Sequence, residues 1–244
     1  MSTPDGRHKK TLQEVVTHYN LCLSQNPKGT DQSWPKSYVE RFYSKVFAGC
    51  ANQNITLMQI GKDQERSLIM WCQYFSNAQI YGWDGESTLA VRASMNNGKL
   101  GDIAKEPIES VFMTQVEADT ILQRRFDVII EKRSTTLEEQ VRSIQKFAEL
   151  LKPDQSVLVV ENISNGGLGL LRLIAATPKQ FTGHFYDFRG HRLVANNCIY
   201  AIRRYRKDEG VLMNRLLMLA IAVCYLIIEG LLNMINKMAL NHRR

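Results

Sequence analysis

Short apolar runs alternate with amphipathic stretches from residue 55 onward. Apolar residues recur at helical spacing in 67–75, 136–151 and 168–176. Lys152-Pro153-Asp154 follows the second of these stretches and is typical of the end of a helix. The apolar runs are continuous and lie at 55–60, 78–84, 108–113, 126–131 and 156–163. Continuous apolar strands separated by helices predict an α/β protein whose parallel sheet is covered on both faces.

Two more strands and two flanking helical regions complete the predicted organisation. FTGHFYDF (181–188) and LVANNCIYAIRRY (193–205) are joined by RGHR, which predicts a hairpin at one edge of the sheet. Helical spacing at 12–23 and 36–47 precedes the first strand. We therefore expect three regions. They are an N-terminal helical segment at 1–50, an α/β domain at 51–207 and a hydrophobic C-terminal helix at 211–240.

The C-terminal helix contains an uninterrupted apolar run at 216–228, extended by EGLL to Leu232. At about 1.5 Å per residue the run is about 20 Å long, short of the about 30 Å core of a bilayer. On a helical wheel one narrow polar stripe remains, made of Arg215, Glu229, Asn233, Asn236 and Lys237.

Three interpretations of this helix stay open: a short membrane span, a helix in the membrane surface, or a helix packed on a partner in a homo- or hetero-oligomer. Basic residues on both flanks suit anionic lipid. Because every predicted strand ends by Tyr205, we expect a chain ending near Lys207 to fold without the helix.

Composition and charge narrow the range of possible partners, metal sites and locations of the protein. The hydrophobic content of 44% and charged content of 23% are ordinary for a globular protein, and the net charge is +7. Basic clusters lack interleaved aromatic residues, so nucleic acid is not an expected partner. The five cysteines are scattered and predict neither a disulfide framework nor a zinc site. With a polar start and no apolar signal segment, we expect an intracellular, membrane-associated protein.

Several separated segments carry a family resemblance in their order and spacing. They are GTDQSWPKSYVERFYSKVF (29–47), ITLMQIG (55–61), SLIMWCQYFSNAQIYGWD (67–84) and FDVIIEKRSTTLEEQVRSIQKFAELLKPDQSVLVVENI (126–163). Together they resemble the class I S-adenosylmethionine-dependent methyltransferases of the macrocin and mycinamicin sugar O-methyltransferase type. The resemblance covers about residues 28–205. It implies a Rossmann-like, seven-stranded methyltransferase fold with an antiparallel last strand.

The cofactor positions implied by this resemblance are partly changed. Such enzymes have an acid and then glycines after the first strand, because the chain must pass close to the cofactor and only glycine has no Cβ. Here Gln59 replaces the acid, Gly61 is kept, and Glu65 and Arg66 replace later glycines. The resemblance also assigns the ribose contact to Asp84 and the adenine contact to Gln115. We therefore expect weak binding of S-adenosylmethionine through Gly61, Asp84 and Gln115.

The catalytic positions depart further from the family. Its D-D-G-S-H after the fourth strand becomes Glu131, Lys132, Arg133, Ser134 and Thr135, and its E-D after the fifth becomes Glu161 and Asn162. A hard cation needs several carboxylate oxygens, so no metal is expected beside an ammonium and a neutral amide. Thr135 cannot replace a histidine base near neutral pH. Glu131 and Glu161 remain as candidate catalytic residues, or as partners of Lys132 or Arg133 in structural ion pairs.

Two functions follow. The first is a methyltransferase-fold protein that has lost the usual catalytic set and works as a membrane- or partner-attached binding module. The second is an active S-adenosylmethionine-dependent O-methyltransferase with an altered, metal-independent site, in which Glu131 or Glu161 is the base.

Overall fold

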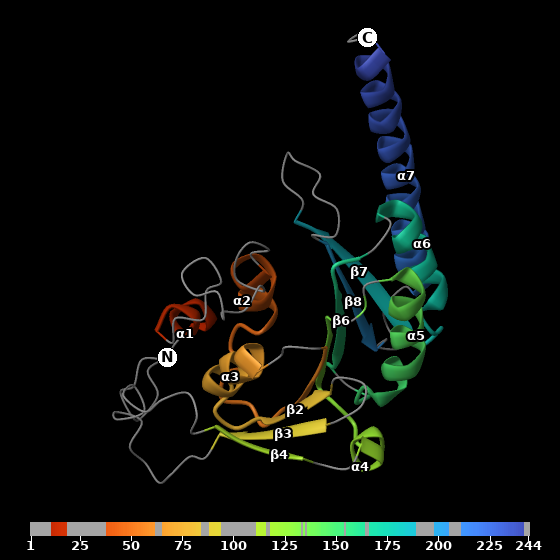
Figure 1. The fold of residues 1–244 in the computed structure, drawn as a ribbon. Coiled ribbons are helices and arrows are strands. Elements are labelled where there is room, and N and C mark those ends of the chain that lie inside the picture. Colours follow the sequence, from red (N-terminus) through yellow and green to blue (C-terminus); the bar gives the residue numbers. More distant parts are fainter. Residues whose placement is uncertain are drawn as a thin grey trace. The chain divides into compact units, whose positions relative to one another are not determined.

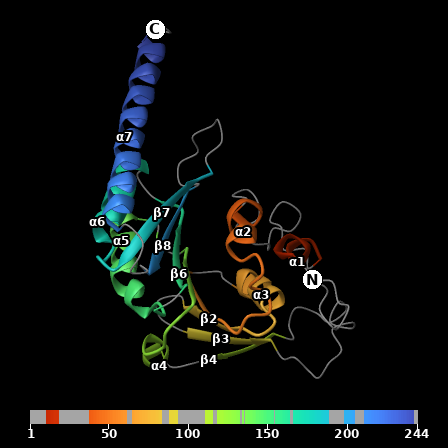
Figure 2. The same cartoon turned by 180° about the vertical axis from the view of Figure 1, so that it is seen from behind.

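A computed structural model shows two compact units, Met1–Arg124 and Arg125–Arg244, and each is described by itself. The structure describes residues 11–18, 38–61, 65–83, 88–93, 111–115, 118–132, 134, 136–153, 155–163, 166–188, 198–204 and 211–241. These residues form eight strands and the helices that flank them (Figures 1 and 2).

The first unit combines helices with a four-stranded sheet portion. Its strands follow the order β4-β3-β2-β1, with β1 and β2 parallel and β3 antiparallel to both of its neighbours. The elements in chain order are α1 (Leu12–His18), the π-helical turn η1 (Val39–Tyr43), α2 (Ser44–Val46), β1 (Thr56–Ile60), α3 (Glu65–Tyr74), β2 (Gln79–Trp83), β3 (Thr88–Ala93), β4 (Val111–Gln115) and α4 (Ala118–Leu122).

An aromatic cluster joins the N-terminal helices to α3. The rings of Tyr43 and Phe47 pack edge-to-face on the buried Trp71 indole, with centroids 5.1 and 5.7 Å away. Phe75, one helical turn later, packs on Phe47 with centroids 5.3 Å apart. Aromatic pairs at these distances add to the stability gained from burial. The N-terminal helices therefore belong to the hydrophobic core of this unit.

The second unit has the strand order β5-β6-β8-β7. Strands β5 and β6 are parallel, and β8 pairs antiparallel with both β6 and β7. Its elements in chain order are β5 (Val128–Glu131), α5 (Leu137–Phe147), the 3-10 turn η4 (Ala148–Leu150), β6 (Val157–Glu161), α6 (Gly166–Ala176), β7 (Phe181–Asp187), β8 (Cys198–Arg204) and α7 (Val211–Asn241).

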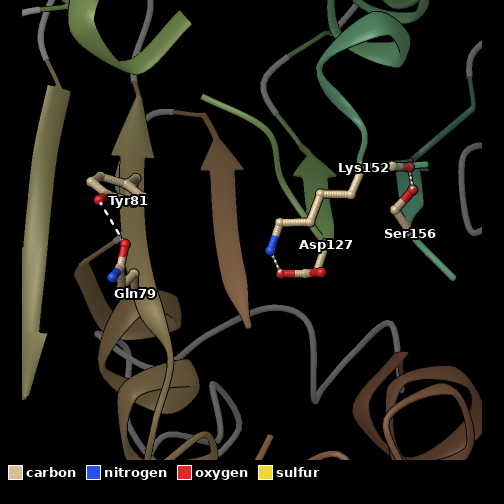
Figure 3. Close-up of polar contacts among 5 residues, drawn as sticks. All are labelled: Gln79, Tyr81, Asp127, Lys152 and Ser156. Atoms are coloured by element: carbon tan, nitrogen blue, oxygen red, sulfur yellow. Dashed lines mark hydrogen bonds and ion pairs between the residues drawn. The ribbon is translucent and has the colours of Figure 1, made fainter. Parts of the chain in front are cut away.

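Local signals explain where α5 begins and how the chain returns to the sheet. Thr136 and Glu139 form a reciprocal capping box, in which each side chain accepts from the other's backbone N–H. After the helix, Lys152 Nζ donates to Asp127 Oδ2 at 2.6 Å, and Ser156 Oγ donates to the Lys152 carbonyl (Figure 3). The stretch before β6 is thereby held to the start of β5.

In the first unit, the Tyr81 hydroxyl of β2 donates to Gln79 Oε1 on the same strand, over 3.4 Å (Figure 3).

Each of the seven predicted strands overlaps an observed strand, with bounds that differ by at most five residues, and the antiparallel last strands are confirmed. Strand β3 is an addition that the sequence analysis missed. Its sequence TLAVRA is a short alternating stretch, unlike the continuous apolar runs of the predicted strands. Alternation suits an antiparallel strand, which is how β3 pairs. The turn of the predicted hairpin, RGHR, lies outside the described residues.

Helix α7 differs from the appendage that the sequence suggested. Figures 1 and 2 show α6 lying along α7, which extends beyond it. A Cβ at Gly167 of α6 would lie 2.8 Å from the Leu226 backbone nitrogen and 3.1 Å from the Ala222 carbonyl oxygen, so the two backbones touch. Met218 and Ala222 of α7 are buried. The first part of α7 is therefore part of the packed core of the second unit.

Candidate functional site

The carboxyl end of β1 makes a turn at a glycine. Gly61 follows the strand directly and has a φ of +156°, which favours glycine because it lacks a Cβ. Its N–H donates to the Trp83 carbonyl, the last residue of β2, at 2.9 Å. The ends of the two parallel strands are thereby held together. Asp84, the predicted ribose contact, follows Trp83 and lies outside the described residues.

Gln59, which stands where related sites have an acid, belongs to the core. Its side chain is fully buried, and its Oε1 accepts a hydrogen bond from Trp71 Nε1 at 2.9 Å. Its Nε2 has no hydrogen-bond partner among the described residues. The Gln59 amide thus points at the aromatic cluster on α3. It offers no negative charge to a cationic ligand.

Glu65 and Arg66 form the first turn of α3, which begins at Glu65. Helix α3 therefore begins at the positions where the family resemblance implies the later glycines. The directions of the Glu65 and Arg66 side chains lie outside the described part of the chain. Their expected obstruction of a ligand stays a prediction.

Gln115, the predicted adenine contact, is the last residue of β4. It pairs with Leu89 of β3, and Leu89 pairs with Gly82 of β2. The inserted strand β3 therefore separates Gln115 from β2 by two strand spacings, about 10 Å. Gln115 lies at the same sheet edge as Gly61, but it is one strand farther from β2 than a directly paired third strand would place it.

Glu131 ends β5 and is completely buried. Its Oε1 accepts hydrogen bonds from the backbone N–H and the hydroxyl of Ser134, both at 2.9 Å. The Ser134 hydroxyl also lies 3.4 Å from the Ser143 hydroxyl on α5. The Glu131 carboxyl therefore closes a local turn after its own strand. Sequence analysis missed this role, although the E-x-x-S spacing could have suggested it.

Glu161 ends the neighbouring parallel strand β6 and is also completely buried. The next residue, Asn162, has a left-handed φ of +58°, a conformation that asparagine tolerates better than most residues. The Asn162 N–H donates to the Cys198 carbonyl at 3.0 Å. Gln140 Nε2 of α5 donates to the Asn162 carbonyl at 2.9 Å. Gln140 and β8 thus stabilise the turn that follows β6. The left-handed conformation of this turn explains why asparagine stands at position 162.

The structure brings Glu131 and Glu161 to one edge of the second unit's sheet. Glu131 pairs with Val160, so Glu161 lies on the adjacent strand one residue beyond the partner of Glu131, and the two side chains leave opposite faces of the sheet. Lys132 follows Glu131 and is half-buried, while Arg133 and Thr135 lie outside the described residues. Across the ranges that the structure describes, no three His, Cys, Asp or Glu side chains are grouped closely enough to hold a metal ion.

Known structures resemble this arrangement over most of the chain. The MycE methyltransferase from the mycinamycin biosynthetic pathway, solved in complex with Mg and SAH, superposes with a TM-score of 0.52 at 18% identity. A second structure of it, with Mg, SAH and mycinamycin VI, has a TM-score of 0.51 at 19% identity. Each match covers 83% of this chain and 57% of the other. No protein-family model and no curated protein sequence matches the chain.

The chain has the class I methyltransferase fold. The resemblance of the sequence to the mycinamicin type is confirmed at the level of the fold. Because this chain spans only 57% of the length of MycE, the Mg, SAH and mycinamycin VI named there are properties of that enzyme.

The methyltransferase fold implies S-adenosylmethionine, and the described residues match the positions expected for it only in part. Gly61 keeps the glycine that the family resemblance implies, but it is buried, and its N–H is bonded to the end of β2. On the methionine side, Gln59 is neutral and bonded to Trp71 instead of facing a ligand ammonium. The described residues therefore offer no negative charge to the amino-acid portion of the cofactor, and no methyl-transfer step follows from them.

Proposed function

We propose that this protein is a methyltransferase-fold binding module that has lost the usual catalytic set and is attached to a membrane or a partner through α7. The observation that carries the first part is the Gln59–Trp71 hydrogen bond inside a closed aromatic core. A side chain that should hold the ammonium of S-adenosylmethionine instead stabilises the packing of α3 on β1. Losing one charge-assisted hydrogen bond reduces the binding free energy of a ligand by about 1.5–3 kcal/mol, which lowers its affinity roughly ten- to a hundredfold.

Attachment through α7 rests on the polarity of that helix. One helix in the described residues, Met213–Leu231, is long and apolar enough to cross a membrane by length and composition alone. Ten large hydrophobic side chains of α7 are at least 40% exposed. Soluble monomers rarely expose an apolar surface of this extent unless it binds something.

A second candidate is an active O-methyltransferase with a metal-independent site. The observation in its favour is that Glu131 and Glu161 are both retained at the carboxyl ends of adjacent strands, where α/β proteins carry catalytic groups. In that case one of these carboxylates accepts the proton of the substrate hydroxyl.

Calorimetric titration of the detergent-solubilised full chain with S-adenosylmethionine, with and without magnesium, tests the proposal. We expect weak binding that magnesium does not enhance, and no methyl transfer to hydroxylated acceptors. The variant Asp84→Ala is the matched control for cofactor binding at the predicted ribose position. If Asp84→Ala lowers the remaining affinity for S-adenosylmethionine, Asp84 contacts the bound cofactor.

Two results would contradict the proposal. Tight binding by the unmodified chain would mean that Gln59 does not limit the site. A magnesium-dependent methyl transfer that Glu161→Ala abolishes would establish the enzyme instead of the binding module.

A further inference from the structure

The polarity of α7 is inverted relative to a helix on the surface of a soluble protein. Every described side chain of α7 that is exposed is apolar or small. We call these positions the outward face. They are Met213, Leu216, Leu217, Leu219, Ala220, Val223, Cys224, Ile227, Ile228, Gly230, Leu231, Met234 and Met238. At 100° per residue they cover about half of the helix circumference.

Three polar side chains of α7 are instead bonded to its own fold. Arg215 donates to the carbonyls of Thr177 and Pro178, both at 2.9 Å, just past the C-terminus of α6. Glu229 accepts from the N–H of Gly167 at 3.2 Å, in the first turn of α6. An anion at the N-terminus and a cation at the C-terminus both suit the dipole of α6. Tyr225 donates to Asp187 at the end of β7.

These contacts exclude a perpendicular membrane span for the packed part of α7. The apolar window Met213–Leu231 is the same stretch that carries Arg215 and Glu229 against α6. If it crossed a bilayer, α6 would enter the hydrocarbon with it. On α6, Arg172 forms a 2.7 Å ion pair with Glu138 of α5, and both side chains are about half exposed. Charged groups of this kind belong in water.

The positive charge around α7 favours an anionic lipid surface over a second copy of the chain as the binding partner of the outward face. Residues 203–244 hold eight Lys and Arg against three Asp and Glu, so this stretch contributes +5 of the net charge of +7. Arg203, at the end of β8, is exposed. Two copies packing through the same helix would bring like charges together. An anionic lipid surface attracts basic residues that flank an apolar helix face.

We propose that α7 lies in the plane of an anionic membrane surface, with its outward face among the acyl chains and the α/β fold on the water side. From Met213 to Met238 the outward face is about 39 Å long at 1.5 Å per residue. Such a helix sinks about 5–10 Å into the boundary between headgroups and chains. The inference rests on the proposed attachment through α7, and it adds the orientation of the helix and the class of lipid.

Vesicle flotation of the full chain tests the proposal with phosphatidylcholine vesicles, alone or with about a third phosphatidylserine. We expect at least tenfold stronger binding to the anionic vesicles, and weaker binding at high salt. The double variant Ile227→Gln and Leu231→Gln should lower binding at least tenfold without changing the circular dichroism spectrum. The matched control Ile227→Val and Leu231→Met, which keeps the face apolar, should bind as the unmodified chain does.

A C-terminal epitope tag reports the orientation of α7. In sealed vesicles, protease added outside should remove the tag. A protected tag would mean that α7 spans the bilayer, which overturns the in-plane orientation while leaving membrane attachment intact. Equal binding to neutral and anionic vesicles would overturn the choice of lipid. If no vesicle binds the chain and light scattering shows a dimer that the Gln variants abolish, a second copy covers the outward face. The inference then fails, and attachment to a partner stands.

Discussion

At the scale of single residues, Gln59 shows how a ligand position becomes part of a core. Its Oε1 accepts from Trp71, while its Nε2 has no acceptor among the described residues. A buried polar group without a partner is costly, so the pair is stabilising only while both partners are present. The indole N–H and the amide oxygen are therefore coupled.

Removing the indole N–H should reveal this coupling. We expect Trp71→Phe to destabilise the protein more in the native background than in a Gln59→Leu background, by about 1–2 kcal/mol. The loss of ring volume is common to both backgrounds, so the difference isolates the hydrogen bond. Urea denaturation of the four chains measures it. Equal costs in both backgrounds would mean that the hydrogen bond contributes nothing to stability.

The cysteines should differ sharply in reactivity. Burial raises the pKa of the Cys72 thiol to about 12, because the charged thiolate loses its hydration. At pH 8 only roughly one Cys72 in ten thousand is then the nucleophilic thiolate. Cys224 is exposed on the outward face of α7.

We expect a small thiol reagent that enters detergent and lipid to modify Cys224 in the native protein long before Cys72, as mapped by peptide mass spectrometry. Denaturant should remove the difference, since unfolding hydrates both thiols. Rapid modification of Cys72 without denaturant would contradict its burial against the core.

At the scale of elements, the contact between α6 and α7 depends on the small residues at the start of α6. A Cβ added at Gly167 would press on the backbone of α7, whereas a Cβ added at Gly230 meets nothing within 4 Å. The two glycines form a matched pair, because both are helical and only one lies at the contact.

Gly167→Ala should therefore lower the free energy of unfolding by about 1–3 kcal/mol through overpacking. Gly230→Ala should raise it by about 0.5–1 kcal/mol, because alanine is the better helix former. Thermal unfolding followed by circular dichroism measures both. A stabilising Gly167→Ala would show that α6 and α7 do not touch as described.

At the scale of the whole molecule, the helix at residues 211–240 changes what a truncated chain should do. The sequence predicts that a chain ending near Lys207 folds alone, because all predicted strands precede that point. The structure packs α7 against α6 and β7, and Arg215 and Glu229 bond to the two ends of α6. Removal would expose the apolar surface that Met218 and Ala222 cover.

We now expect the chain ending at Lys207 to be less stable than the full chain, with earlier protease cleavage around α6. Limited proteolysis with mass mapping compares the two chains, both in detergent so that the outward face does not aggregate. A truncated chain with unchanged protection of α6 would restore the original prediction and make α7 a dispensable anchor.

The sequence by itself determined the α/β fold class, because apolar runs separated by helical spacing indicate strands that alternate with helices, whereas the antiparallel pairing of β3 and β4 came only from the structure. It also placed Gly61, Glu131 and Glu161 at strand ends, since those positions depend only on where each strand stops. Only the tertiary structure decided their surroundings. Whether Gln59 faces a ligand or Trp71, whether β3 joins the sheet, and whether Glu229 meets lipid or α6 all depend on residues distant in the chain. Periodicity reports which face of an element is apolar, and contacts across the fold decide what that face meets.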